Sequence, residues 1–207
     1  MLAILAPAAS AAPLPDGFAV VAKSPDGKLG VLVPDVDHVK DGEQQNAVVE
    51  LATGKVLATI DASTTFQSQS HAEIRARWSA DRSTLVWYVD GKWESYAFVV
   101  VTFDHGTVHQ LDVRRMALPK ALAAMRAARP AVFAEIKARS DRAGSYYNDG
   151  FVVDIRPANG KASLPLPIVI EINGNPKDMD DVPSLAGTMT GVVGTDGKLT
   201  LSKLTVK

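Results

Sequence analysis

Histidine is the side chain that moves protons most readily near neutral pH, and this chain has four: His38, His71, His105 and His109. His105 and His109 flank a predicted hairpin turn, so their spacing does not bring two imidazoles onto one helical face as zinc proteases require. We interpret both as surface residues. His71 follows a polar run over residues 63–70 and opens a predicted strand. We expect it to anchor that loop through a hydrogen bond to the backbone, and catalysis is the alternative.

Carboxylates cluster at two places, and neither matches the pattern of a calcium loop. Asp35 and Asp37 are followed by Val39 and Lys40, where an EF-hand needs a further ligand and a glycine. A tighter second cluster runs into a valine and a proline, which break the same template; its members are Asp178, Asp180 and Asp181. We expect solvated loops at both places, with opportunistic calcium at the second cluster as the alternative, and no resident metal or cofactor.

The motifs of the common catalytic sites do not occur in this sequence. It contains no G-x-S-x-G, H-E-x-x-H, P-loop or G-x-G-x-x-G pattern. It also has no cysteine, which removes disulfides, thiolate nucleophiles and cysteine-ligated zinc. Two carboxylates distant in the chain could still meet and hydrolyse a glycoside, so a hydrolase stays open as an alternative.

Aromatic residues concentrate between residues 78 and 96, where they could stack on the apolar faces of sugar rings. The set is Trp78, Trp87, Trp93, Tyr88 and Tyr96. Strand alternation puts Trp87 and Val89 on one face and Val86 and Tyr88 on the other, so only part of the set can be exposed together. We therefore favour a core role over a binding platform.

Positive charge concentrates in one segment. The chain as a whole has 22 Lys and Arg against 23 Asp and Glu, which gives no reason to expect nucleic acid as a partner. Between Arg114 and Arg142, however, eight bases stand against two acids, a local charge of +6. The candidate binding surface is Arg126, Arg129, Lys137 and Arg139. We interpret it as a face that keeps the protein soluble; the alternative is that it binds an acidic envelope polymer, a lipid headgroup or an acidic protein.

A helical period positions these bases. Apolar residues recur at three and four residues through this segment, as Leu118, Leu122, Met125, Val132, Phe133 and Ile136, and the bases lie mostly off that stripe. We predict a helical segment over 117–143, with Pro119 in a first turn and Gly144 at the end. Pro130 predicts either a kink or two short helices meeting there.

Strand and turn signals fill the rest of the chain and repeat once. Residues 18–60 and 71–113 each read as a four-stranded meander, and Ser24 aligns with Ser79 at an offset of 55 residues. Further strands are expected over 150–206, with Asp196-Gly197 as a two-residue hairpin turn. The prediction is a mainly β (α+β) fold in one domain over 12–207.

The two repeats resemble a known architecture. "KSPDGKLGVLV" and "WSADRSTLVWYV" look like the repeat of TolB-type, WD40-like β-propellers, in which an SPDG turn joins two strands of a blade. The second copy lacks the Pro and the Gly of that turn. The stretch "FQSQSHAEIRARWSADRSTLVWYVDGKW" also resembles a group of uncharacterised exported bacterial proteins. That resemblance covers residues 18–115 and implies location rather than activity.

The N-terminus gives the same indication of location. A short apolar run over residues 2–6 is followed by Ala9-Ser10-Ala11, the A-x-A pattern that signal peptidase accepts. We interpret residues 1–11 as the remnant of a signal peptide and expect the mature protein to begin at Ala12, in the periplasm or outside the cell. No later stretch approaches the roughly 18 apolar residues of a membrane-spanning helix. The predicted function is an exported, non-enzymatic binding or envelope-associated protein; the alternative is a secreted or periplasmic hydrolase of glycan or peptide that uses carboxylates or His71.

Overall fold

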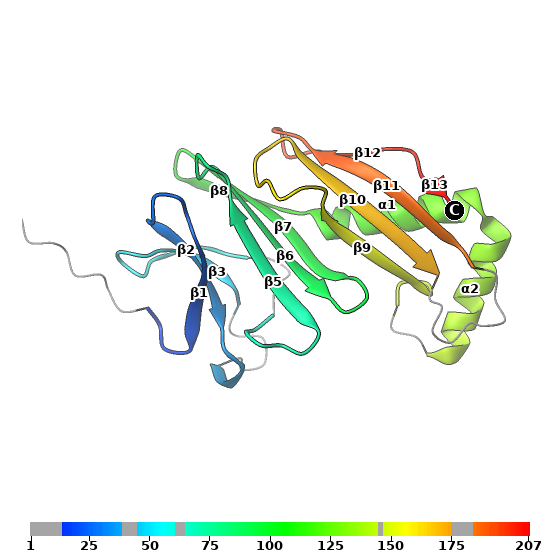
Figure 1. The fold of residues 1–207 in the computed structure, drawn as a ribbon, viewed down its shortest axis with the longest axis horizontal. Helices are drawn as coiled ribbons and strands as arrows, with labels where there is room; N and C mark the ends of the chain where they lie inside the picture. The colour runs from blue at the N-terminus through cyan, green and yellow to red at the C-terminus, as the bar shows by residue number, and fades with distance from the viewer. Residues whose placement is uncertain (1–13, 39–44, 61–64, 145–146, 175–183) are drawn as a thin grey trace, which may run out of the picture.

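The computed structural model describes residues 14–38, 45–60, 65–144, 147–174 and 184–207, which form three antiparallel β-sheets and two α-helices (Figure 1). Sheet A lies at the blue N-terminal end, sheet B follows in green, and sheet C carries the yellow to red C-terminal strands. A short 3₁₀ helix, η1 (Val36–His38), follows the second strand. The predicted mainly β fold of antiparallel meanders with a short helix pair is confirmed.

Sheets A and B are meanders with the same strand order. Sheet A consists of β1 (Phe18–Lys23), β2 (Leu29–Pro34), β3 (Ala47–Glu50) and β4 (Val56–Thr59), each paired with the next. Sheet B consists of β5 (Ala72–Trp78), β6 (Thr84–Gly91), β7 (Ser95–Asp104) and β8 (Thr107–Asp112), paired in the same way. The strands fall within the two predicted repeats, 18–60 and 71–113.

The turn between β1 and β2 is closed by a serine and an aspartate. The Ser24 hydroxyl donates to Asp26 Oδ1 at 2.7 Å and accepts from the Leu29 amide at 2.9 Å. Gly27 has a φ of 68°, a left-handed conformation that glycine adopts without strain. The side chains thus satisfy backbone groups that the turn takes out of the ladder.

The turn between β5 and β6 repeats this network although two of its residues differ. The Ser79 hydroxyl donates to Asp81 Oδ1 at 2.6 Å and accepts from the Thr84 amide at 2.9 Å. Arg82 takes the position of Gly27 with a φ of 58°, so the left-handed conformation is kept without a glycine. The serine and the aspartate therefore define the turn, and the Pro and the Gly of the first copy are dispensable for it.

Two layers bury sheet B on both faces. Leu85, Trp87 and Val89 of β6 face sheet A, where they pack with residues such as Val31 and Val48. The opposite face of sheet B packs into a larger core with the helices and sheet C, and its members include Val86, Tyr88, Phe98 and Val100. The predicted alternation along β6 is confirmed. Both faces exclude water, which explains why β6 reads as an almost continuous apolar run.

Two helices follow sheet B: α1 (Val113–Ala128) and α2 (Pro130–Ala143). The break at Pro130 and the end at Gly144 are confirmed; Gly144 has a φ of 63°. The predicted start at residue 117 is wrong, because the Asp112 carboxylate accepts from the Arg115 amide at 2.8 Å and caps a helix that begins four residues earlier. Pro119 therefore lies inside α1 rather than in its first turn.

Sheet C has the strand order β12-β11-β10-β9, and β13 also pairs with β11. Its strands are β9 (Phe151–Pro157), β10 (Leu166–Gly174), β11 (Ala186–Val193), β12 (Leu199–Leu201) and β13 (Thr205–Val206). The predicted two-residue turn at Asp196-Gly197 is wrong, since Val193 pairs with Leu199 across a longer connection. In that connection the Lys198 amide donates to Asp196 Oδ1 at 3.1 Å, as the Lys28 amide does to Asp26.

Several predicted features lie outside the described residues. These are the signal-peptide remnant over residues 1–11, the acidic cluster from Asp178 to Asp181, and residues 39–40 of the first acidic motif. Within the described residues, neither helix has the length and apolar character needed to cross a membrane.

Candidate functional site

His71 lies in a turn before β5 and is exposed. It has a φ of 61°, and the Ala72 amide closes the turn by donating to the Gln69 carbonyl at 3.2 Å. A shallow pocket of about 380 Å³ beside it is also lined by Gln69, Glu73 and Asp90. The His71 side chain makes no hydrogen bond to any described residue. Its anchoring role and its catalytic role both stay predictions.

His105 and His109 are exposed, in agreement with their interpretation as surface residues. His105 Nε2 lies 3.5 Å from Asp104 Oδ1 within the β7–β8 turn. His109 follows on β8 and lines a groove between sheets B and C. His105 thus lies in the turn itself and His109 on the strand after it, so the prediction that both flank the turn is right only for His109.

The aromatic set divides between core and surface. Trp87 is fully buried and Tyr88 is nearly so, whereas Trp93 and Tyr96 near the β6–β7 turn are 54% and 44% exposed. Trp78 is partly buried, with its ring centroid 5.4 Å from that of Phe103. The core interpretation is therefore right for the middle of sheet B. At the β6–β7 end of the sheet two rings stay accessible.

The candidate basic surface is partly neutralised by an acid that sequence reasoning missed. Asp149, in the segment before β9, accepts from Arg126 at 3.3 Å and from Lys137 Nζ at 2.9 Å. Lys137 also reaches Asp141 at 3.2 Å, and the Arg126 guanidinium lies 5.0 Å from the Phe133 ring centroid. Hydrogen bonds to Asp149 and Asp141 raise the pKa of Lys137, so it stays charged within this cluster. Arg126 and Lys137 thus tie the two helices to the β9 segment.

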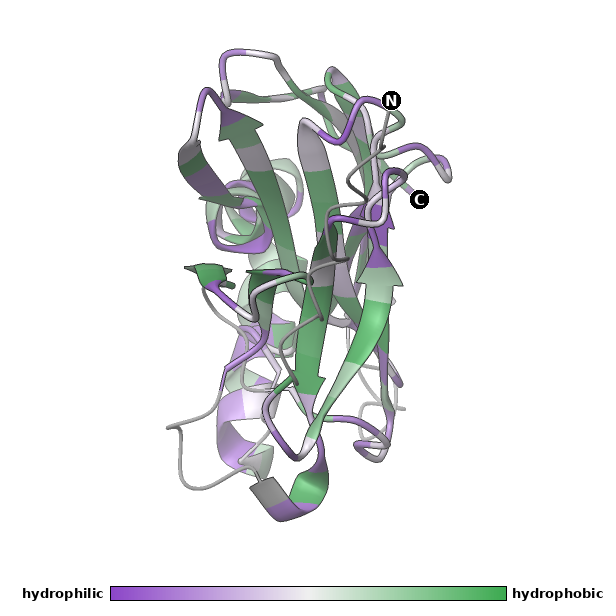
Figure 2. Cartoon of the chain, turned by 90° about the vertical axis from the view of Figure 1, so that its left-hand side faces the viewer, coloured by the Kyte–Doolittle hydropathy of each residue, from purple (hydrophilic) through white to green (hydrophobic). Residues whose placement is uncertain are grey.

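Other bases of the helices are free to meet a partner. Four exposed side chains have no ion pair or hydrogen bond within the described part of the chain, and we call them the basic helical layer: Arg115, Lys120, Arg129 and Arg142. Of the candidate residues, only Arg129 belongs to it; Arg139 makes an interaction of its own. Figure 2 shows the hydrophilic purple segments alternating with apolar ones along the helices, while apolar green runs along many strands.

A groove with both polar and apolar lining residues lies where sheet B meets sheet C, and we call it the B–C groove. It has a volume of about 680 Å³. Its polar lining comes from the β5–β6 turn, the start of β6, β7, β8, the β9–β10 connection and the β11–β12 connection. The residues are Asp81, Ser83, Thr84, Thr102, Asp104, His109, Ser163, Thr195 and Asp196. A smaller pocket of about 140 Å³ adjoins it and adds the apolar side chains of Leu111 and Val193. Clefts formed between structural units are common ligand sites.

Hydrogen bonds stabilise the ionised form of two carboxylates of the B–C groove, those of Asp81 and Asp196. Hydrogen bonds from Ser79 and from Ser83 lower the pKa of Asp81, and the Lys198 amide and side chain lower that of Asp196. A general acid needs a raised pKa to hold its proton at neutral pH. These two groups therefore serve as charged hydrogen-bond acceptors.

Glu94 has a raised pKa, but its carboxyl group connects elements of the fold and does not line the B–C groove. Burial raises the pKa of Glu94, against the Arg114 charge and hydrogen bonds from the Val153 amide and Asn148. Its Oε1 lies 3.4 Å from Arg114 Nη2, and its Oε2 accepts from Asn148 at 3.1 Å and from Val153 at 3.4 Å. Next to it, the Ser95 hydroxyl accepts from the Ile155 amide at 2.9 Å. These contacts join β7 to α1 and to β9, so both oxygens of Glu94 are already engaged by the protein.

The described residues contain no group of three or more His, Asp and Glu side chains that could hold a metal ion. In comparisons with known proteins, no family model matches the chain, and neither does any curated protein or solved structure. The likeness of the repeats to propeller blades and the likeness to exported bacterial proteins therefore stay expectations.

Proposed function

We propose that this protein is an exported, non-enzymatic binding domain that attaches to an anionic component of the cell envelope through the basic helical layer. The observation that carries the proposal is that four exposed side chains of the two helices have no ion pair or hydrogen bond to a described residue: Arg115, Lys120, Arg129 and Arg142. Export is proposed on the A-x-A pattern that ends at Ala11.

The helical region keeps a net positive charge even when Asp149, which pairs with two of its bases, is included, and this supports the proposal. Residues 114–149 contain eight bases and three acids (Glu135, Asp141 and Asp149), a net charge of +5, while the whole chain is −1. The apolar side of both helices is in the core, with Met125, Phe133 and Ile136 buried. The bases of the layer must therefore face water, where each can approach an anionic surface without losing a protein partner.

The alternative function, a hydrolase that uses an acid or base catalyst, has less support from the described residues. Hydrogen bonds lower the pKa of Asp81 and of Asp196 in the B–C groove, so both stay ionised. Among the described residues the one carboxyl whose pKa is raised is that of Glu94, and it already contacts Arg114, Asn148 and Val153. His71 has no described partner that could orient it as a base. These observations favour binding over hydrolysis.

The proposal is tested by measuring retention of the purified mature protein on two matched pairs of surfaces. The first pair is vesicles that contain an acidic phospholipid and vesicles of neutral phospholipid. The second pair is an acidic and a neutral polysaccharide. We expect retention on the acidic forms at low salt and a steep loss towards physiological ionic strength, where charges are screened over about 8 Å. Equal retention on acidic and neutral forms, or retention that salt does not change, would overturn it. The acidic surface that retains the protein best identifies the class of envelope component.

A further inference from the structure

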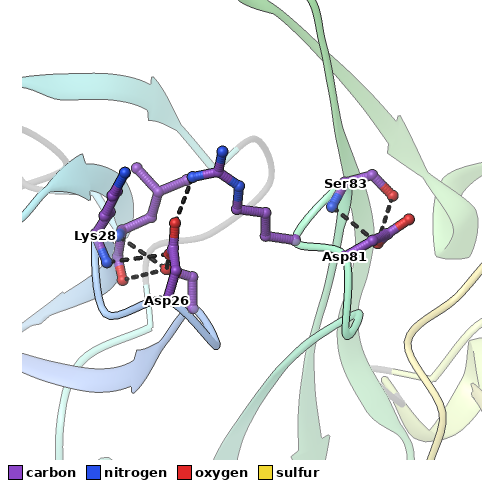
Figure 3. Close-up of polar contacts among 7 residues, drawn as sticks. Asp26, Lys28, Asp81 and Ser83 are labelled. Carbon is purple, nitrogen blue, oxygen red and sulfur yellow. Dashed lines mark hydrogen bonds and ion pairs between the residues drawn. The ribbon is translucent and has the colours of Figure 1, made fainter.

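The two ends of strand β6 differ in what their side chains contact. At the β5–β6 turn the protein engages its own polar groups, because the Arg82 guanidinium pairs with Asp26 of sheet A (Figure 3). At the β6–β7 turn, Trp93 and Tyr96 are 54% and 44% exposed. The other large apolar side chains of sheet B are buried or partly buried. Exposed tryptophan and tyrosine rings are typical of surfaces that bind a ligand.

The hairpin holds both rings in place without covering them. The Gly91 amide donates to the Glu94 carbonyl at 3.0 Å and closes the turn. The Tyr96 ring packs on Gly91, where a Cβ atom would lie 2.5 Å from Tyr96 Cε1, so a larger residue does not fit there without moving the ring. The Lys92 ammonium lies 5.2 Å from the centroid of the Trp93 ring, within the range of a cation–π contact. A ligand would therefore meet rings that are already positioned, which lowers the entropy cost of binding.

A polar pocket adjoins both rings. It has a volume of about 380 Å³, and Gly91 and Lys92, which contact the rings, are among its lining residues. Glu73 and Asp90 also line it. Arg75 Nη2 lies 2.7 Å from Glu73 Oε2, and its Nε lies 2.8 Å from Asp90 Oδ2. The charges of Arg75 and Lys92 thus balance the two carboxylates, so a neutral polar ligand matches this pocket better than an ion of either sign.

Two further side chains of the pocket can exchange hydrogen bonds with a ligand. One is the exposed imidazole of His71. The other is Gln69, whose side-chain oxygen is buried beside the pocket and accepts no hydrogen bond from a described residue. A buried acceptor without a donor is destabilising, so a group that donates to it is favoured there. Hydroxyl groups, which both donate and accept, suit a pocket with an amide, an imidazole and two carboxylates.

We propose that this end of sheet B binds a neutral glycan, with Trp93 and Tyr96 stacking on sugar rings and the pocket binding the hydroxyls. Pyranose rings with equatorial substituents, such as β-linked glucose and N-acetylglucosamine, have apolar faces of axial C–H bonds that match an aromatic ring. Their hydroxyls lie around the edge of the ring and can bind the polar groups of the pocket. The sugar-stacking role considered for the whole aromatic set thus belongs to the two exposed rings.

A glycan fits this site better than a protein partner does, because a stable protein interface buries about 800 Å² on each side and two rings beside a polar pocket offer far less apolar surface. The site shares no residue with the basic helical layer. Stacking is also not screened by salt, unlike the attraction between exposed charges. Binding of a neutral glycan should therefore persist at an ionic strength that releases the protein from an acidic surface.

The test is a titration of the full chain with cellotriose and with triacetylchitotriose, followed by tryptophan fluorescence and by NMR. D-Glucitol, which has the hydroxyls of glucose but no ring, is the control ligand. We expect saturable binding of at least one trisaccharide, with less than about a twofold change between low and physiological salt, and no saturable binding of glucitol. The trisaccharide that binds more tightly identifies the sugar.

Variants locate the site. Trp93→Ala should weaken trisaccharide binding about tenfold or more, whereas Trp93→Phe, which keeps a ring, should stay within about threefold of wild type. Gln69→Leu removes the amide at a similar volume and should weaken binding about threefold. Val192→Ala, which removes an exposed apolar side chain of sheet C, should leave binding unchanged. Arg115→Glu/Arg129→Glu in the basic helical layer should also leave it unchanged.

Three results would overturn the proposal: no binding of either trisaccharide, equal binding of glucitol, or unchanged binding in Trp93→Ala. Loss of trisaccharide binding in Arg115→Glu/Arg129→Glu would overturn it too, because the glycan would then be bound by the basic helical layer.

Discussion

Removal of Arg114 tests the contacts that join sheet B to sheet C. Arg114 and Glu94 retain 20% and 13% exposure of their side chains, and their charged groups lie 3.4 Å apart. Breaking a buried ion pair by deleting one partner costs about 3–5 kcal/mol, because the other charge is left uncompensated. The remaining exposure reduces this for Arg114→Ala to about 2–3 kcal/mol, which includes the lost hydrogen bond from Arg114 Nε to the Ser95 carbonyl.

The matched variant is Glu94→Gln, which removes the charge and keeps an acceptor for the Val153 amide. Burial already raises the pKa of Glu94, which means that the folded state disfavours its charged form. The neutral amide should therefore cost under about 1 kcal/mol, much less than loss of the arginine.

The cost of Arg114→Ala should depend on pH with a defined sign. A carboxyl whose folded-state pKa is raised stabilises the fold below its unfolded pKa, and that contribution is lost as pH rises through the folded pKa. Loss of Arg114 raises the pKa of Glu94 further, because the arginine charge opposes the effect of burial. The loss in free energy of unfolding of Arg114→Ala relative to wild type should therefore become smaller as the pH falls from about 7.5 to about 5.

Urea unfolding of wild type and both variants at the two pH values measures these quantities. The reasoning would be refuted if Glu94→Gln were as destabilising as Arg114→Ala, or if the loss in Arg114→Ala were the same at both pH values.

Three further predictions concern the core, the turns and the charge of the helices. Trp87→Ala should destabilise by about 3–5 kcal/mol in chemical denaturation, as loss of a fully buried ring does, while Trp93→Ala at a half-exposed position should stay within about 0.5 kcal/mol. Ser24→Ala and Ser79→Ala should each cost about 1–2 kcal/mol and agree within about 0.5 kcal/mol, because the two hydroxyls make equivalent bonds; a difference above that would separate the turns energetically. Asp149→Asn should strengthen retention on an acidic column at low salt, because it releases Arg126 and Lys137; weaker or unchanged retention would place those bases outside the binding surface.

The sequence predicted those parts of the fold that depend on local patterns. Alternation placed Trp87 and Tyr88 on opposite faces of β6, and the Ser-x-Asp pairs marked equivalent turns. The start of α1 was predicted too late, although Asp112 before an apolar-periodic run is a capping signal that could have been used.

The parts that the sequence did not predict depend on distant residues. Asp149 lies after the helices in the chain and reaches back to Arg126 and Lys137, so no spacing within the helices indicates the pairing. The B–C groove brings Asp81 and Asp196 to the same cavity from two different sheets. Such contacts follow from how the sheets pack against each other, and no local period in a single sequence encodes that packing.

The most direct test of the proposed function compares two double variants with the same change in charge. Arg115→Glu/Arg129→Glu reverses two members of the basic helical layer, whereas Lys55→Glu/Lys161→Glu reverses two exposed lysines in turns away from the helices. Retention of both on the acidic vesicle or polysaccharide that best retains wild type is measured at low salt, after circular dichroism shows that both are folded. The proposed function predicts that the helix variant loses retention and the control keeps most of it. Equal loss in the two variants would show a response to net charge alone and would contradict a binding surface on the helices.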